Sequence, residues 1–167
     1  MLQEVDLKGA YRATPTGLYL VSTAKDGKRN VQFAFRALGI LDAPPLILVG
    51  IQHSNYSLGI IKETREFVLN TCSEGQLHAV QKSSGLSGRD VEDKFAALGF
   101  EALPSKHVKA PRVAGCQANV ECRVLNHMEA EKVTLFLVQA LACYVDDKLQ
   151  PVARFDGKTF RIEGPIG

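Results

Sequence analysis

Polar and apolar residues alternate along several short stretches of the chain, and a period of two is typical of β-strands. The clearest case is residues 29–36, where Val31, Phe33 and Phe35 alternate with the residues between them. Residues 119–125 alternate in the same way. Further strands, short and rich in β-forming residues, are predicted at residues 16–23, 46–51, 67–71 and 158–162.

Turn residues and one long apolar run add to this pattern. Asp26-Gly27 predicts a tight hairpin, because glycine accepts the positive φ that such a turn requires. Pro44-Pro45 cannot donate ladder hydrogen bonds and predicts a break before residues 46–51. Residues 133–145 are apolar on both faces, which indicates a strand covered on both sides. The core would cover one face of this strand, and a partner subunit could cover the other.

Three short helices are predicted among these strands. Ser54 is placed as the N-cap of a helix that runs to about Thr64. Residues 76–82 form the second helix, and residues 91–98 form the third, with Gly99 just past its end. The order of elements predicts a mainly β protein, a β-barrel with short helices, rather than a doubly wound parallel sheet. No linker or repeat divides the chain, so residues 1–167 are expected to form a single domain.

Composition excludes several classes of protein. A net charge of +2 with scattered basic residues gives no electrostatic footprint for nucleic acid. The longest apolar runs are too short to cross a membrane, and the first residues lack the pattern of a signal peptide, so we expect a cytoplasmic protein. The cysteines form no CxxC pair and are expected to be buried, reduced thiols rather than metal ligands.

Few residues suggest chemistry by themselves. No GxGxxG follows a strand, no P-loop or metal motif is present, and no hydrolytic Ser/His/Asp or Cys/His arrangement stands out. Ser54, Asn55 and Ser57 lie where a strand gives way to a helix, and hydroxyls and free N–H groups there suit a phosphate. The same residues also suit an ordinary helix cap, which the residues alone favour.

An ordered series of motifs goes further. The segment 29–36 is followed by Pro44-Pro45, the apolar run 46–51, the turn Ser54-Asn-Tyr-Ser57, the strand Glu66-Phe-Val-Leu-Asn70 and Asp93-Lys-Phe95. In this order and spacing the chain resembles the flavin-reductase-like family, which includes flavoredoxin. The resemblance implies an FMN-binding split β-barrel, usually a homodimer, with FMN near the subunit interface.

The resemblance also implies a site. The strand of residues 29–36 would run beside the isoalloxazine ring with its polar face turned outward, and the turn at Ser54 would meet the FMN phosphate. Asn70 would bond to the ring or end its strand, and the loop at Ser84-Gly85 would lie near the exposed side of the flavin or be a plain surface loop. The predicted cofactor-binding residues are Asn30, Gln32, Phe33, Ala34, Phe35, Arg36, Ser54, Asn55, Ser57, Asn70, Ser84 and Gly85. Asp93-Lys94-Phe95 is taken as structural, with Phe95 docking its helix and both charges solvated.

Two departures from the family leave the activity open. The family usually carries Thr and Ser where this chain has Phe33 and Phe35, and a histidine of a Gly-Asp-His motif where it has Val133. His53 and His78 could approach the pocket, but lone histidines are more often surface or satisfied residues. The leading hypothesis is an NAD(P)H:flavin oxidoreductase that passes hydride to FMN and electrons on to an acceptor. The alternative is a non-catalytic electron-transfer protein, reduced by a protein partner as a flavoredoxin is. A third is a barrel that has lost FMN and binds haem or another flavin.

Overall fold

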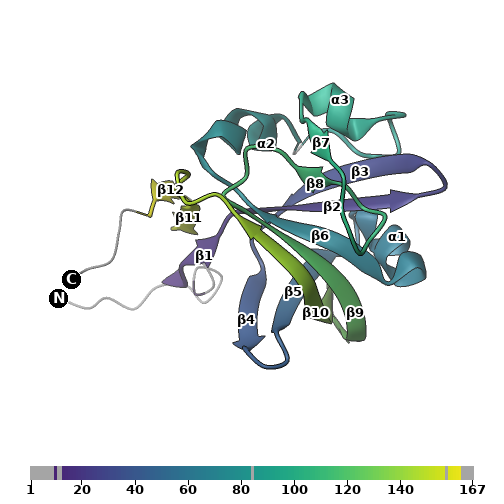
Figure 1. Cartoon of the computed structure of the whole chain (residues 1–167), viewed down its shortest axis with the longest axis horizontal. Coiled ribbons are helices and arrows are strands. Elements are labelled where there is room, and N and C mark those ends of the chain that lie inside the picture. Colours follow the sequence, from purple (N-terminus) through teal and green to yellow (C-terminus); the bar gives the residue numbers. More distant parts are fainter. Residues whose placement is uncertain (1–9, 11–12, 84, 157, 163–167) are drawn as a thin grey trace.

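A computed structural model of the chain describes residues 10, 13–83, 85–156 and 158–162. One large sheet dominates it (Figure 1). Its strands are β2 (Tyr19–Lys25), β3 (Lys28–Ala34), β4 (Ala37–Leu41), β5 (Leu46–Gln52), β6 (Glu66–Thr71), β9 (Ala118–Ala130) and β10 (Val133–Val145). They are arranged in the order β3-β2-β6-β9-β10-β5-β4, and each neighbouring pair is antiparallel.

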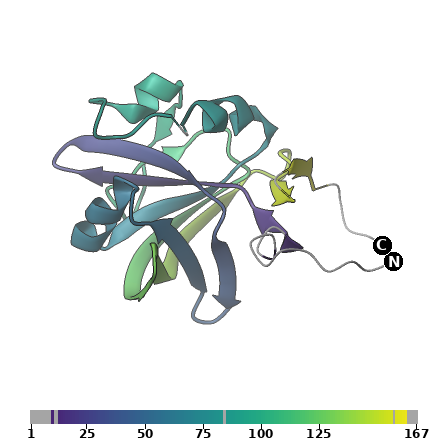
Figure 2. The same ribbon diagram turned by 180° about the vertical axis from the view of Figure 1, so that it is seen from behind.

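In the described part of the chain, two small sheets and three α-helices accompany the large sheet. The small sheets contain β1 (Thr16–Gly17), β11 (Val152–Phe155) and β12 (Lys158–Arg161), and β7 (Ala102–Leu103) with β8 (Arg112–Val113). The helices are α1 (Ser57–Thr64), α2 (Leu77–Ser83), which follows a 3-10 turn at Glu74–Gln76, and α3 (Lys94–Leu98). In Figures 1 and 2, α2 and α3 lie on one side of the β2–β3 hairpin and α1 lies on the other. Strand β3 is therefore covered on both faces.

The hairpin between β2 and β3 confirms the prediction at Asp26-Gly27. Lys25 pairs with Lys28, and the two turn residues have φ angles of 50° and 77°. Two successive positive φ angles are the signature of a type I′ turn, whose twist matches that of the strands it joins. The turn fixes the register of β3, and with it which side chains of β3 face each side.

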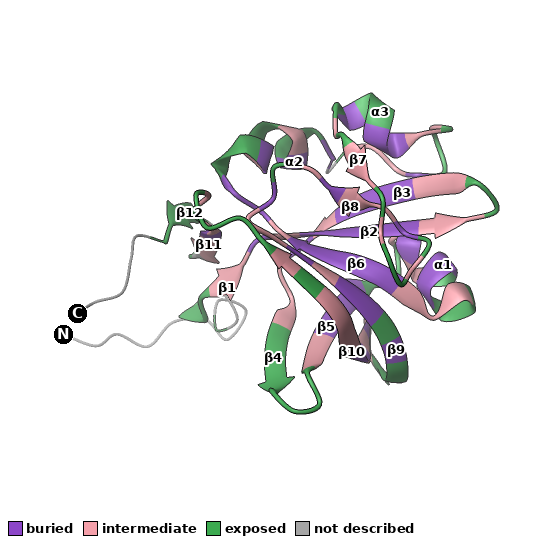
Figure 3. Ribbon diagram, viewed as in Figure 1, coloured by how far each residue is buried: buried purple, intermediate pink, exposed green. Residues whose placement is uncertain are grey.

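Two hydrophobic cores follow from this register. Val21, Phe67 and Phe136 belong to the core inside the curled sheet. Leu20 and Phe95 belong to a second core between the hairpin and helices α2 and α3. Figure 3 shows buried residues running along β2, β3 and β6. The adjacent β2 residues Leu20 and Val21 thus pack into different cores, because successive side chains of a strand point to opposite faces.

Several predicted boundaries are wrong. The helix predicted from Ser54 begins at Ser57, and the helix predicted from Val91 begins at Lys94. In the second case the Asp93 carboxylate accepts hydrogen bonds from the N–H groups of Phe95 and Ala96, so it is the N-cap and ends the preceding loop. Strand β4 was not predicted, since its sequence does not alternate; it is held by antiparallel pairing with β5.

The sheet is open between its edge strands. β3 and β4 follow each other in the chain but lie at opposite edges of the sheet, joined by Phe35 and Arg36. The Gly50 N–H of β5 donates to the Arg36 carbonyl at 2.8 Å, which extends the pairing of β4 with β5 by one residue toward β3. A Cβ on Gly50 would lie 3.0 Å from the Arg36 Cβ, so glycine permits the close approach. The candidate site lies beside this junction.

Candidate functional site

A pocket of about 410 Å³ lies between β3, the segment that follows β5, and the segment from α2 to the start of α3. Its volume is within the range of small-molecule sites, roughly 300–1,000 Å³. It is lined by Asn30, Gln32, Phe33, Ala34, Phe35, Arg36, Gly50, Gln52, Ser54, Asn55, Tyr56, Ser83, Gly85, Leu86, Ser87, Gly88, Asp90 and Lys94.

Nine of the twelve residues predicted from the sequence line this one pocket. They are Asn30, Gln32, Phe33, Ala34, Phe35, Arg36, Ser54, Asn55 and Gly85. Ser84 lies outside the described residues. Ser57 and Asn70 are described and do not line the pocket. Segments that are far apart in the sequence thus converge at the open edge of the sheet.

Ser57 supports the pocket from behind. Its side chain is buried, and its Oγ accepts a hydrogen bond of 2.7 Å from Asn30 Nδ2. Ser54, predicted as the helix cap, is exposed and three residues before α1, whose N-cap position is Tyr56. The helix-cap interpretation of Ser54 is therefore wrong, while Ser54 and Asn55 remain available to a ligand in the pocket.

Asn70 lies in a buried network on the other side of β2. Its Nδ2 donates to the Leu20 and Val68 carbonyls and to Ser22 Oγ at 2.9–3.2 Å. Its Oδ1 accepts from the Val113 N–H at 3.0 Å and from Asn119 Nδ2 at 2.8 Å. With its donors and its acceptor engaged inside the protein, Asn70 neither reaches the pocket nor ends the strand, which continues to Thr71.

The polar side chains of β3 contrast with this network. The prediction that their face turns outward is wrong, because it turns inward. Gln32 is only 6% exposed, and Asn30 is buried. Within the described part of the chain, neither amide atom of Gln32 has a hydrogen-bond partner, nor does Asn30 Oδ1. Burying such groups without partners is unfavourable by about 1–3 kcal/mol each. Because both residues line the pocket, a polar ligand there would supply the missing partners.

Lys94 is a pocket residue that the sequence interpretation missed. Its side chain is 5% exposed rather than solvated, and burial lowers its pKa, an effect that the nearby Asp90 opposes. No hydrogen bond or ion pair joins its ammonium to another described residue. The signal in the sequence was its spacing from Leu98: residues four apart share a helix face, and Leu98 is buried.

Asp93 is also bound rather than solvated. Arg29 donates to both of its carboxylate oxygens at 2.6–3.0 Å, and this ion pair lowers the pKa of Asp93. The Arg29 guanidinium lies 5.2 Å from the ring centroid of Phe95, which is fully buried as predicted. The pair fastens the start of α3 to β3 and so holds Lys94 in the pocket wall.

Phe33 and Phe35 form an aromatic wall where the family usually has hydroxyls. Their ring centroids are 6.4 Å apart and their planes differ by 29°. The guanidinium groups of Arg36 and Arg154 lie 4.3 Å and 5.8 Å from the Phe35 centroid. This end of the pocket therefore presents flat aromatic surface with positive charge beside it.

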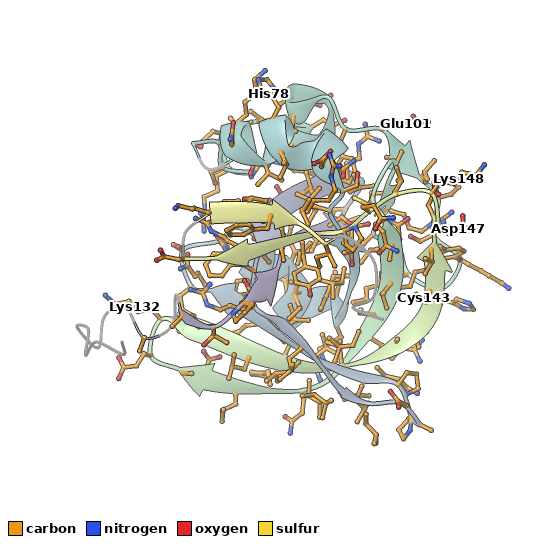
Figure 4. The ribbon with its side chains drawn as sticks, turned by 90° about the vertical axis from the view of Figure 1, so that its left-hand side faces the viewer. His78, Glu101, Lys132, Cys143, Asp147 and Lys148 are labelled. Atoms are coloured by element: carbon orange, nitrogen blue, oxygen red, sulfur yellow. The ribbon has the colours of Figure 1, made fainter. Side chains whose placement is uncertain are left out.

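Neither His53 nor His78 lines the pocket, so the interpretation of both as surface or satisfied residues holds. His53 Nε2 lies 2.8 Å from Glu129, whose carboxylate also accepts from Lys62 and Thr134, and these contacts lower the Glu129 pKa to about 2. His78 is exposed on α2 and points away from the molecule in Figure 4. Among the described lining residues there is no histidine to act as a proton donor.

The described residues contain no cluster of three or more side chains suited to a metal ion. Within the same residues, no helix is long and apolar enough to span a membrane. Cys72, Cys116 and Cys122 are buried free thiols, as predicted, but Cys143 is exposed (Figure 4). It lies on β10 beyond Gln139, where pairing with β5 ends and that side of the strand loses its cover.

The chain is similar in sequence to several known proteins. The profile of the Flavin reductase like domain matches residues 11–163. An uncharacterized protein of Archaeoglobus fulgidus is 37% identical over 127 residues, which are 76% of this chain and 71% of that protein. A flavin reductase (NADH) of Kitasatospora aureofaciens is 28% identical over 131 residues, 78% of this chain and 66% of the reductase.

Solved structures confirm the predicted mainly β split-barrel fold. The NADH:FAD oxidoreductase SgcE6 of Streptomyces globisporus C-1027 superposes with a TM-score of 0.87 at 19% identity, over 98% of this chain and 99% of that one. The flavoredoxin of Desulfovibrio vulgaris (Miyazaki F) gives 0.84 at 24% identity, over 99% and 96%. By the family match and the fold together, the chain belongs to the flavin reductase like family.

Proposed function

We propose that the chain binds FMN in the 410 Å³ pocket and works as a flavin reductase, with NAD(P)H as the electron donor. The observation that carries this proposal is the buried, unpartnered amide of Gln32, together with Asn30 Oδ1, in the wall of that pocket. The isoalloxazine ring carries both donors and acceptors on its edge, so it can satisfy an amide that offers both. The 28% identical NADH-dependent flavin reductase supports the choice of donor.

The other pocket residues divide between the two ends of such a ligand. Ser54 and Asn55 offer polar groups for a phosphate, and the Lys94 ammonium offers the charge that a buried phosphate needs. Phe33 and Phe35 offer aromatic surface to a flat ring. The redox chemistry itself, hydride transfer from a nicotinamide and electron delivery to an acceptor, would be supplied by the bound FMN. The chain's residues bind, orient and shield, so the pocket needs no acid–base pair.

A second candidate function is electron transfer without nicotinamide chemistry. No described lining residue is a histidine, and Val133, where the family usually has one, pairs with Gln52 and lies outside the pocket wall. A protein of this kind would bind FMN and receive electrons from a redox partner protein. The structural likeness to a flavoredoxin is compatible with this alternative.

One experiment separates the candidates. The purified protein is mixed with FMN, freed of unbound flavin and examined by visible absorption before and after anaerobic addition of NADH or NADPH. Rapid bleaching of the bound flavin supports the reductase. Bands that persist with both nucleotides, but bleach with dithionite, indicate the electron carrier. A protein that retains no FMN contradicts both and leaves haem or another flavin as the ligand to test.

We also propose that the protein is a homodimer, which the family resemblance implies. Support comes from an apolar stripe across the outer face of four strands. The register places Leu38 opposite Leu48, and Leu48 opposite Leu137; Leu135, on the same face of β10, pairs with Met128. Leu38 and Met128 are 63% and 60% exposed. Light scattering after size exclusion should give twice the mass of one chain. Met128→Lys should reduce the measured mass toward that of one chain. A monomeric parent protein would refute the proposal.

A further inference from the structure

Two buried thiols lie side by side where the pairing of β6 with β9 ends. Cys72 follows the last residue of β6, and Cys116 lies two residues before β9. Both side chains belong to the second core, where Cys72 is 0% and Cys116 is 5% exposed. Both are free thiols in the structure, and neither lines the flavin pocket.

An extra residue in the chain before β9 brings the two cysteines opposite each other. The paired residues of β6 and β9 end with Thr71 and Ala118. The Thr71 carbonyl nevertheless accepts a hydrogen bond of 2.9 Å from the N–H of Gln117, the residue before Ala118. Two residues of one strand thus face one residue of the other, as in a β-bulge, and the register shifts by one. The shifted register places Cys116 opposite Cys72.

Hydrogen bonds around the pair agree with this register. Ser73 Oγ donates to the Gly115 carbonyl at 2.9 Å, so the next two residues also face each other. The Cys72 N–H donates to the Leu18 carbonyl at 2.9 Å, and the Cys72 carbonyl accepts from the Val152 N–H at 3.1 Å. Because these bonds turn the Cys72 backbone away from Cys116, the two cysteines form a pair without backbone hydrogen bonds to each other. Opposed residues of that kind have Cα atoms about 4.5 Å apart and side chains close together. A disulfide spans roughly 4.4–6.8 Å between Cα atoms, so this pair is within its reach.

The two thiol groups contact each other. A hydrogen bond to the Cys116 thiol, followed by burial, raises the pKa of the Cys72 thiol. Cys116 is the less buried of the two and follows Gly115, which is exposed, so a reagent from solvent meets Cys116 first. The other cysteines lie elsewhere: Cys122 belongs to the core inside the curled sheet, and Cys143 is exposed on β10 (Figure 4).

The pair also lies at the base of one excursion of the chain. Residues 73–115 leave the sheet after β6 and return before β9, and they contain α2, α3, β7 and β8 (Figure 1). This segment supplies Gly88 and Lys94 to the wall of the flavin pocket. A bond between Cys72 and Cys116 would close it into a long loop. Such a bond stabilises a fold by restricting the unfolded chain, and the effect grows with the length of the closed loop.

We propose that Cys72 and Cys116 are a modification site at which a small-molecule disulfide forms an intramolecular disulfide that fastens the base of the segment 73–115. The Cys116 thiolate attacks one sulfur of the reagent and displaces the other sulfur as a thiolate. The Cys72 thiolate then attacks the Cys116 sulfur of the mixed disulfide and displaces the second thiolate. The protein loses two protons and two electrons, and the reagent is reduced to two thiols. No flavin takes part, so the inference does not rest on the proposed function.

Mass spectrometry and thermal unfolding test the site on the folded protein. Cys143→Ser removes the exposed thiol and serves as the background, and the reagent is oxidised glutathione in mildly alkaline buffer. We expect a mass lower by two hydrogen atoms. Digestion with trypsin and with a protease that cleaves after glutamate separates Cys116 from Cys122 at Glu121, and should yield one peptide pair joined through Cys72 and Cys116. The melting temperature should rise by about 5–10 °C and fall back after dithiothreitol.

Cys116→Ala in the same background is the test variant, and Cys122→Ala is the matched control, since each removes one buried thiol. The cross-link and the rise in melting temperature should disappear in the first and persist in the second. If Cys116→Ala does not fold, the peptide map of the background protein decides the question by itself. Three results would overturn the inference: thiols that all survive prolonged oxidation just below the melting temperature, a cross-link through Cys122, or a Cys72–Cys116 bond that leaves the melting temperature unchanged.

Discussion

Two buried amides on either side of β2 have opposite surroundings. Asn70 of β6 pairs with Leu20, and Gln32 of β3 pairs with the next residue, Val21. Both side chains are almost completely buried. Asn70 makes hydrogen bonds through both ends of its amide, whereas Gln32 makes none within the described protein. The same functional group is thus satisfied on one side of the strand and unsatisfied on the other.

The difference separates a structural polar residue from a binding one. Native proteins rarely leave buried polar groups without partners, and each exception requires an explanation. For Asn70 the partners lie on strands of the large sheet and on β8, so its amide fixes β8 against the sheet. For Gln32 the space beside the amide is the pocket. Burial alone does not distinguish the two residues, but hydrogen-bond satisfaction does.

The largest effect is expected from removing the satisfied amide. Asn70→Ala leaves the Val113 N–H and Asn119 Nδ2 without their shared acceptor and opens a small cavity. We expect the free energy of unfolding to fall by about 3 kcal/mol, the sum of two such losses. Urea denaturation followed by circular dichroism measures it. FMN affinity of the folded fraction should be unchanged, because Asn70 does not line the pocket.

Asn126→Ala is the control for this prediction, since Asn126 is exposed on β9 and its side chain accepts only from the next residue. Its unfolding free energy should change by less than about 0.5 kcal/mol. An Asn70→Ala protein of unaltered stability that has lost FMN would reverse the comparison, making Asn70 the binding residue.

The unsatisfied amide should respond in the opposite way. Gln32→Met keeps the length of the side chain and removes groups that have no described partner. We therefore expect the unfolding free energy to stay the same or rise, while the Kd for FMN rises about tenfold, as when one or two hydrogen bonds to a ligand are lost. Fluorescence titration and urea denaturation of one preparation give both numbers. Gln150→Met, on an exposed loop, should change neither. A marked loss of stability in Gln32→Met would mean that the amide has partners inside the protein.

The sequence predicts those features of the site that depend on neighbouring residues, but not those that depend on contacts with distant parts of the chain. The alternation of residues 29–36 predicts correctly that Asn30, Gln32 and Ala34 share one face of a strand. The pattern does not tell which face is covered, because that depends on α1, which packs against β2 and β3 from later in the chain. The outward assignment of these residues failed for this reason.

The wrong assignment of Lys94 has a local cause. A lysine in a short polar segment is usually exposed, and the Asp93 cap that starts α3 at Lys94 was not recognised. With the correct start, helical spacing places Lys94 above the buried Leu98. The environments of Ser54 and Ser57 differ from the prediction for a similar reason, since the N-cap of α1 is Tyr56, two residues after the predicted cap. Ser54 lines the pocket, whereas Ser57 is buried in the first turn of the helix. Errors of a few residues in a helix boundary decide which side chains reach the pocket.

The smallest effect concerns the Lys94 ammonium, another polar group in the wall of the pocket. Burial lowers its pKa below the usual 10.5. A lysine whose folded-state pKa is depressed destabilises the protein when charged, so stability is lost as pH falls through the folded pKa and is fully regained above 10.5. As pH rises to 10.5, the parent protein should therefore gain stability relative to Lys94→Met. Lys82→Met, exposed on α2, should show no such gain.

Bound FMN phosphate should reverse the trend, because a paired ammonium favours its charged form. The affinity of the parent protein for FMN should then decline as pH rises. An FMN affinity of Lys94→Met equal to that of the parent at every pH would leave Lys94 without a ligand and confine the unsatisfied site to β3.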